Sequence, residues 1–293
     1  MRPRTAFLLY RGSADVIRAL PGPVAGALAD AVGGLGALSP RRRAVVTENL
    51  RRVLGPTARP STLRRTVRRA FRAYGRYWVD AARLRSDATR LLAGFEYEGA
   101  EILEKAAGER RGVILALPHV GCWEVGGAWC ARNGFPLTTV AEPASSRELF
   151  DWFVAEREAI GLRVLLLDRA AAPELLATLR RGQVVALLAD RDVAGDGVEV
   201  EFFGSTTRVP GGPALLALRT GALLVPTAIY HGPGGRHHAV LRPPLEVARR
   251  ASLREDVARL TQELTRELEV LIARRPEQWH VFQPNWPGDP PAA

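Results

Sequence analysis

From Asp87 onward the chain alternates between short apolar runs and amphipathic helical segments, which limits the folds it can adopt. Most of the apolar runs are continuous, a pattern typical of strands that are buried on both faces of a parallel sheet. Segments with helical spacing separate most of these runs, as expected where helices cover both faces. The sequence therefore predicts an α/β fold, a single domain with a mostly parallel or mixed central sheet flanked by helices.

The bounds of these elements follow from the apolar runs and from the glycines and prolines beside them. The expected strands are 112–118, 137–141, 163–167, 183–189, 198–203, 223–230 and 239–241. The expected helices are 101–107, 123–133, 147–160, 173–181, 213–220 and 253–273. No internal repeat or linker divides this part of the chain, so we expect one core over residues 86–293.

Residues 1–85 are expected to form basic amphipathic helices that face a membrane. The turn Pro21-Gly22-Pro23 separates two short helices with apolar residues on one face. From 41 to 85 the pattern is helical, and its polar face is almost wholly arginine. The apolar positions at helical spacing are Leu63, Val67, Ala70, Phe71, Tyr74 and Trp78, and the arginines among them are Arg64, Arg65, Arg68, Arg69, Arg72 and Arg76.

The formal net charge is +10, and Lys105 is the only lysine. Guanidinium groups suit phosphates, so an anionic membrane surface is the expected partner, at about 1 kcal/mol for each cation near it. The sequence has no zinc-finger spacing, RNA-binding aromatic motif or helix-turn-helix signature, so nucleic acid is not expected. No apolar run approaches the roughly 20 residues of a spanning helix, and no cleavable signal peptide is expected.

Several common catalytic patterns are missing from the sequence. There is no G-x-S-x-G elbow and no glycine-rich phosphate-binding loop, which argues against a serine hydrolase and against nucleotide binding. Cys122 and Cys130 are eight residues apart, which fits neither a redox pair nor a disulfide framework. We expect both to be small core residues in a reducing compartment.

The best candidate for chemistry is His119, which follows an apolar run that ends at Pro118. Residues five apart do not meet within one regular helix, so His119 and Glu124 can cooperate only if the histidine precedes the helix. A carboxylate bonded to one ring nitrogen would leave the other free to take a proton from a hydroxyl. The spacing alone occurs often by chance.

Four further segments contain polar or aromatic residues of interest. Asp190-Arg191-Asp192 ends a buried strand, where α/β folds place their sites. The segment 202–213, with Arg208, is interpreted as an apolar edge that leads into a helix N-terminus suited to an anion. His231, His237 and His238 surround a Gly/Pro turn, which favours a solvated hairpin over a metal site. The segment 276–286 is expected to dock the C-terminus.

In combination and in order, these motifs resemble the lysophospholipid acyltransferase superfamily, in its bacterial branch of lipid A and phosphatidylinositol mannoside acyltransferases. His119 and Glu124 match the His-x4-Asp/Glu hallmark, Arg157 an arginine in the helix after the next strand, and Asp190-Arg-Asp192 an acidic block. Phe202-Phe-Gly, with Arg208 and Pro210, and the motif Pro-x-x-Trp-His-x-Phe-x-Pro from Pro276 complete the set. The likeness extends from about Arg41 to Trp286 and is greatest to the mannoside enzymes.

The resemblance implies a glycerolphosphate acyltransferase-like fold and acyl transfer from a thioester to a lipid hydroxyl. His119 would be the general base, with Glu124 or Asp190 orienting its ring, so the candidate catalytic residues are His119, Glu124 and Asp190. The candidate substrate-binding residues are Arg157, Arg191, Arg208 and Glu142. Acyl-CoA would be the co-substrate, with no cofactor and no metal, at the cytoplasmic face of the cell membrane.

A composition rich in Arg, Ala and Gly indicates a high-G+C source, which favours a phosphatidylinositol mannoside over lipid A as the acceptor. Two alternatives remain at this point. One is a lipid A precursor acyltransferase that uses acyl carrier protein, and the other is a non-catalytic membrane-binding protein.

Overall fold

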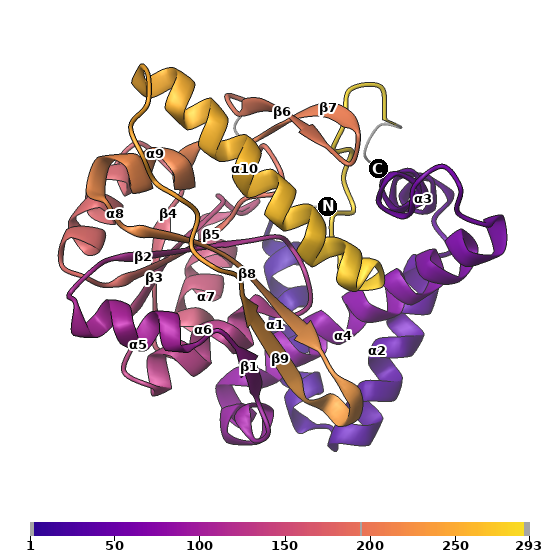
Figure 1. Cartoon of the computed structure of the whole chain (residues 1–293). Coiled ribbons are helices and arrows are strands. Elements are labelled where there is room, and N and C mark those ends of the chain that lie inside the picture. Colours follow the sequence, from indigo (N-terminus) through magenta and orange to yellow (C-terminus); the bar gives the residue numbers. More distant parts are fainter. Residues whose placement is uncertain (1–2, 194, 290–293) are drawn as a thin grey trace.

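The computed structural model describes residues 3–193 and 195–289 of the chain. Within them a seven-stranded sheet has the order β1-β9-β8-β2-β5-β3-β4 (Figure 1). Its strands are β1 (Glu96–Glu98), β2 (Val113–Leu117), β3 (Leu137–Ala141), β4 (Leu162–Leu166), β5 (Val184–Leu188), β8 (Leu223–His231) and β9 (His237–Leu241). The five strands from β8 to β4 are mutually parallel, whereas β9 is antiparallel to β8 and parallel to β1. The expected α/β fold with a mostly parallel sheet is confirmed.

Helices cover both faces of this sheet. The helices of the core are α5 (Glu101–Gly108), α6 (Trp123–Arg132), α7 (Arg147–Glu158), α8 (Ala171–Arg180), α9 (Gly212–Thr220) and α10 (Leu253–Arg274). Those on one face, α8, α9 and α10, pack on one another and on the central strands, and α10 runs diagonally across the sheet in Figure 1. On the other face α6 packs on β3, β4 and β8.

The side chains of β2 illustrate how the two layers are built. All five are buried, and successive side chains of a strand point to opposite faces. Ile114 and Ala116 belong to the apolar cluster that contains the inner residues of α8, α9 and α10. Val113, Leu115 and Leu117 belong to a second cluster, with residues of α5 and α6. Burial on both sides explains why the strand reads as a continuous apolar run.

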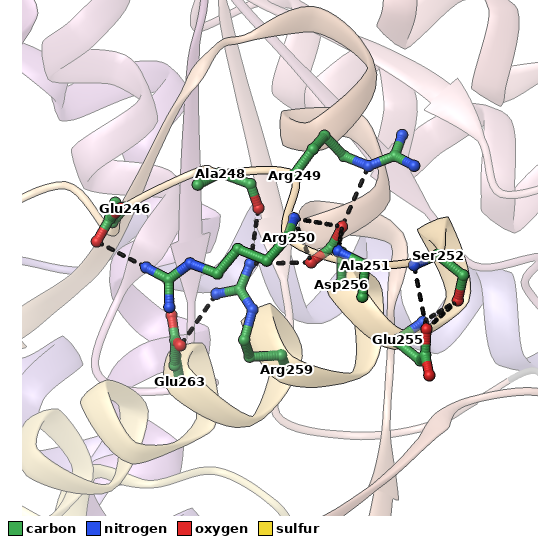
Figure 2. Close-up of polar contacts among 10 residues, drawn as sticks. All are labelled: Glu246, Ala248, Arg249, Arg250, Ala251, Ser252, Glu255, Asp256, Arg259 and Glu263. Carbon is green, nitrogen blue, oxygen red and sulfur yellow. Dashed lines mark hydrogen bonds and ion pairs between the residues drawn. The ribbon is translucent and has the colours of Figure 1, made fainter.

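A polar network fixes the start of α10, the longest helix of the core. Ser252 and Glu255 form a capping box, in which each side chain bonds to the backbone N–H of the other residue. Asp256 is buried and accepts hydrogen bonds from the backbone N–H groups of Arg250 and Ala251 (Figure 2). The preceding loop is thereby held against the first turn of the helix.

Four helices precede the sheet: α1 (Pro3–Ala19), α2 (Gly22–Gly36), α3 (Pro40–Leu54) and α4 (Pro60–Leu92). The expected helical pattern from 41 to 85 is divided in two, because α3 ends at Leu54, just before Gly55 with a φ of +77°, and Pro60 begins α4. Helix α4 continues past the expected boundary at residue 85 and has one non-helical residue, Asp87. Its inner face packs on α1, α2 and α3, and its later part packs on α6. Among the described residues, none of the helices is both long enough and apolar enough to cross a membrane.

Three strands differ from the expectation. The strand predicted at 198–203 does not join the central sheet but pairs with β7 as a two-stranded sheet, β6 (Val198–Phe202) and β7 (Ser205–Val209). Residues 205–209 were expected to be part of an apolar edge that leads into a helix N-terminus, and they form the strand β7 instead. β1 was not expected either, since its three residues are all exposed and have no apolar pattern.

The loop after β2 passes very close to β8. Gly121 has a φ of +61°, and a Cβ atom there would lie 1.9 Å from the carbonyl oxygen of Ile229. The backbone N–H of Cys122 donates to that same oxygen at 3.2 Å, and the N–H of Gly121 donates to the carbonyl of Gln278 at 3.0 Å. Only glycine allows both the left-handed backbone and the close approach.

We expect Gly121→Ala to lower the free energy of unfolding by at least about 3 kcal/mol, because backbone strain and a clash with a carbonyl add together. Gly134→Ala is the matched control: Gly134 also has a positive φ, +80°, but open space surrounds its missing Cβ. It should lose only about 1–2 kcal/mol from the left-handed backbone. Urea unfolding measures both losses, and equal losses would contradict the role given to the Ile229 contact.

Candidate active site

His119 and Asp190 meet because they follow neighbouring parallel strands at equal distances. In the register of β2 and β5, Leu117 lies opposite Leu188. His119 and Asp190 each stand two residues beyond these partners, at the carboxyl edge of the sheet. This is the edge at which open α/β sheets place their ligands.

Asp190 is fully buried, with 0% of its surface exposed, and donors satisfy its carboxylate. Oδ1 lies 2.6 Å from Nδ1 of His119, and Oδ2 accepts the backbone N–H of His119 at 2.8 Å. Oδ2 also accepts the indole N–H of Trp279 at 2.7 Å. Burial raises the pKa of Asp190, but the charge and hydrogen bonds of His119, together with Trp279, outweigh burial and hold that pKa below its ordinary value. The carboxylate is therefore ionised at neutral pH.

An ionised carboxylate at Nδ1 determines which nitrogen of His119 carries the proton. In the neutral ring, Nδ1–H donates to Asp190 and Nε2 keeps its lone pair. Nε2 makes no hydrogen bond to any residue that the structure describes, and the side chain is 15% exposed. This arrangement can remove a proton from a hydroxyl, and Asp190 stabilises the imidazolium that forms.

The C-terminal segment, expected only to dock the chain end, also holds this pair in place. Besides the bond from Trp279, Asn285 donates its amide to the backbone carbonyl of Asp190 at 3.1 Å. The backbone N–H of His280 donates to the carbonyl of His119 at 2.7 Å. Sequence reasoning missed Trp279 and Asn285 as site residues, although the aromatic motif around Trp279 marked the segment.

Glu124 has other partners. Its Oε1 accepts Arg157 at 2.9 Å and the hydroxyl of Tyr77 at 3.1 Å. Between the two carboxylates that the sequence left open as partners of His119, the structure thus places Asp190 against the ring. Glu124 instead joins α6 to α7 and to α4, and it engages Arg157, which was expected to be available to a substrate phosphate.

The remaining candidate residues lie at the same edge of the sheet or on the small hairpin. Arg191 forms an ion pair with Glu142 at 2.6 Å; the two residues follow β5 and β3, which are neighbours. Arg208 lies on β7, is exposed and forms no ion pair with the residues that the structure describes. Both cysteines are buried, as expected, and burial raises the pKa of Cys122 well above its ordinary value.

A large cavity lies between the N-terminal helices and the core. Its volume is about 930 Å³, and its lining comes mainly from α1, α2, α4 and α7. Tyr77, Glu124 and Arg157 are among the lining residues. Tyr77 packs on Trp123, whose ring lies edge-on to that of His119 with centroids 5.4 Å apart. A single aromatic side chain thus connects the cavity wall with the histidine.

The interpretation of His231 and His237 as parts of a solvated hairpin was wrong. Their side chains are only 5% and 0% exposed, and both contact Asp80 of α4. The Gly/Pro turn between them indicated a surface hairpin, but α4 packs over the end of that hairpin and buries the rings.

Comparison with known proteins identifies similar chains. The family model described as bacterial lipid A biosynthesis acyltransferase matches residues 2–287. A phosphatidylinositol mannoside acyltransferase of Mycolicibacterium smegmatis is 36% identical over 289 residues, 96% of this chain and 91% of the relative. The protein of that name in Mycobacterium tuberculosis (strain H37Rv) is 39% identical over 83% of this chain and 76% of the relative. A lipid A biosynthesis acyltransferase of Haemophilus influenzae is 25% identical over 63% of this chain and 56% of the relative.

We expect Trp279→Phe to lower the free energy of unfolding by about 2 kcal/mol at pH 7, because Asp190 loses a donor to a charged acceptor. The folded-state pKa of Asp190 lies below the unfolded value of about 3.9, so the stabilisation is complete above that value. It is lost as the pH falls through the folded-state pKa. The deficit of the variant should therefore shrink below about pH 4.

Trp286→Phe is the matched control for this measurement. Trp286 is equally buried, but its indole N–H donates to the uncharged carbonyl of Phe202 at 3.2 Å. Its deficit, about 1 kcal/mol for a neutral hydrogen bond, should not change between pH 7 and about pH 2. Urea titrations across this range measure both variants. A Trp279→Phe deficit that is independent of pH would contradict the coupling to Asp190.

Proposed function

The chain belongs to the bacterial lipid A biosynthesis acyltransferase family, and from this premise we propose its donor, its acceptor and its catalytic base. Membership makes it an acyltransferase of lipid biosynthesis. We propose that it moves a long-chain acyl group such as palmitoyl from acyl-CoA to a mannose hydroxyl of a phosphatidylinositol mannoside. The observation that carries the proposal is the His119–Asp190 pair, whose Nε2 has no partner among the described residues. One aromatic side chain, Trp123, connects His119 with the wall of an apolar cavity.

In the proposed reaction His119 acts on the acceptor hydroxyl. Nε2 takes the hydroxyl proton while the oxygen attacks the thioester carbonyl carbon, and Asp190 stabilises the imidazolium that results. When the tetrahedral intermediate collapses, the carbon–sulfur bond breaks, and the thiol of CoA leaves with the proton from His119. No covalent acyl-enzyme is needed, which agrees with the burial of both cysteines.

The cavity between the N-terminal helices and the core suits the acyl chain. Its volume of about 930 Å³ is within the range of ligand pockets, about 300–1,000 Å³. Leucine, valine and aromatic side chains dominate its lining, and each buried methylene contributes about 0.8 kcal/mol. Glu124 and Arg157 form an ion pair on the cavity wall, so the acyl chain would meet two opposite charges that offset one another.

Arginines at the sheet edge and on the β6–β7 hairpin support a phosphorylated donor or headgroup. Arg208 is exposed and without an ion pair among the described residues, and Arg191 can exchange the partly exposed Glu142 for a phosphate. The choice of a mannoside acceptor is supported by the two mycobacterial relatives, both more similar to this chain than the lipid A enzyme from Haemophilus.

We also propose that the N-terminal helices hold the enzyme on the cytoplasmic face of the cell membrane. Six large apolar side chains of α1 and α2 are about half exposed or more: Leu8, Leu9, Val16, Val24, Val32 and Leu35. Leu38, just after α2, is also exposed. On the neighbouring helices α3 and α4, exposed arginines form no salt bridges with described residues; they include Arg41, Arg43, Arg64, Arg65, Arg68, Arg69 and Arg72. Apolar side chains beside unpaired cations suit an anionic bilayer surface.

Incubation with labelled palmitoyl-CoA and a phosphatidylinositol mannoside should give a labelled, acylated glycolipid, resolved by thin-layer chromatography. His119→Ala removes the general base, and Asp190→Asn favours the wrong tautomer of His119. Each should lower the rate by about 10²–10⁴-fold. Acetyl-CoA should be a much poorer donor, because it leaves the cavity empty. Val270→Ala, at an exposed position of α10, is the matched control and should keep the wild-type rate.

The same assay separates the alternatives. Transfer from acyl carrier protein to a lipid A precursor, without transfer to the mannoside, would replace the proposed substrates. No transfer to either acceptor, together with lipid binding that survives His119→Ala, would indicate a non-catalytic membrane-binding protein.

Replacing Arg64, Arg65, Arg68 and Arg69 by glutamine should weaken binding to anionic liposomes by at least about 10²-fold, at about 1 kcal/mol for each cation. Co-sedimentation at low and high salt measures the effect, and binding of the wild type should fall as salt rises. The control variant replaces four exposed arginines on the other face of the sheet by glutamine, which removes the same charge. These are Arg180, Arg219, Arg254 and Arg266. Equal loss in both variants would contradict a docking role for α4.

A further inference from the structure

A second cluster of chemically capable side chains lies where α4 meets the end of the β8–β9 hairpin. His231 and His237 are the last directly opposed pair of these antiparallel strands, so their side chains project on the same face. Their rings lie 5.2 Å apart, between centroids. Asp80, one turn after Tyr77 on α4, reaches the same point from the covering helix.

The three side chains converge on one position. Nδ1 of His231 and Nε2 of His237 each lie 3.2 Å from the same oxygen, Oδ2 of Asp80. All three atoms lie within 4.8 Å of one another. Zinc bonds of about 2.0–2.1 Å to nitrogen and oxygen place two tetrahedral ligands about 3.3 Å apart. The two 3.2 Å spacings to Oδ2 therefore match those of ligands around one small ion.

We propose that Asp80, His231 and His237 bind a divalent transition-metal ion, with Zn²⁺ as the best fit. Two imidazoles and one carboxylate are donors that Zn²⁺ prefers, and the three come from different elements in a largely buried position. The site is separate from the His119–Asp190 pair and does not depend on the proposed acyl transfer.

A small pocket beside the cluster supplies a route for the ion and room for a fourth ligand. It has a volume of about 210 Å³ and is lined by both histidines and by polar residues of the hairpin and of the end of α10. Three protein ligands leave one tetrahedral position, which water from such a pocket can complete.

The ion would have a structural role, because its ligands hold α4 against the strand that supports the active-site loop. The backbone of His231 exchanges two hydrogen bonds with the side chain of Gln278, next to Trp279. Two residues earlier, Ile229 accepts the N–H of Cys122. A metal at Asp80 would thus strengthen the contact between the N-terminal helices and the two segments that position His119, which are the loop after β2 and the C-terminal segment.

The test is metal content and thermal stability of the full-length protein. After chelator treatment and gel filtration, incubation with ZnCl₂ should restore one ion per chain, measured by mass spectrometry of the metal, and should raise the melting temperature. Asp80→Asn and His237→Asn should each abolish both effects. His238→Asn is the matched control: this neighbouring histidine contacts Glu98 instead, so the variant should bind like the wild type.

If either variant fails to fold, titration of the wild type with Co²⁺ tests the proposed metal site instead. Intense visible bands of a tetrahedral ion support the site. A wild type that takes up no stoichiometric Zn²⁺ and gives no such bands would overturn the proposal and leave a hydrogen-bonded cluster. Binding that persists in folded Asp80→Asn would place the ion elsewhere and would equally overturn it.

Discussion

The candidate active site depends on one buried carboxylate. Removing an ionised group from water is costly unless hydrogen-bond donors replace the solvent. Asp190 is 0% exposed, and its carboxylate receives donors from residues 71 and 89 positions away along the chain. Its backbone carbonyl receives a further donor from 95 positions away. Satisfying this carboxylate therefore brings together the loop after β2, the end of β5 and the C-terminal segment. The orientation of the His119 ring follows from that requirement, so one contact serves both folding and the proposed chemistry.

Much of the fold is encoded locally and could be predicted. The apolar runs of β2 and β5 and the helical spacing of α6 and α10 depend on each segment's own pattern of burial, which the sequence displays. The positions of His119 and Asp190, each just after a buried strand, are visible in the same way. The contacts of each residue cannot be predicted in this way, because they depend on the order of the strands in the sheet.

The choice between Glu124 and Asp190 shows this limit clearly. Glu124 is five residues from His119, whereas Asp190 is 71 residues away, with β3 and β4 between them in the chain. Only the placement of β5 beside β2 makes the distant residue the partner. Trp279 was missed for the same reason, since its indole reaches Asp190 from a segment whose path over the sheet edge no local pattern specifies. The histidines of the hairpin appeared solvated because α4, which buries them, lies some 150 residues earlier in the chain.

Several contacts that could not be predicted from the sequence meet at the end of β8. Ile229 binds the loop of His119 so closely that only glycine fits at 121, and His231 binds the side chain of Gln278, next to Trp279. A shift of this strand end would move the histidine and one donor to its carboxylate together. Asp80 contacts His231 and His237 from α4, the helix that also provides Tyr77 to the cavity wall and to Glu124. The packing of α4 against the hairpin therefore links the cavity to the geometry of His119, although α4 lies outside the sheet that carries the pair. An N-terminal helix that responds to a bilayer or to an acyl chain would act on the His119–Asp190 pair through these contacts.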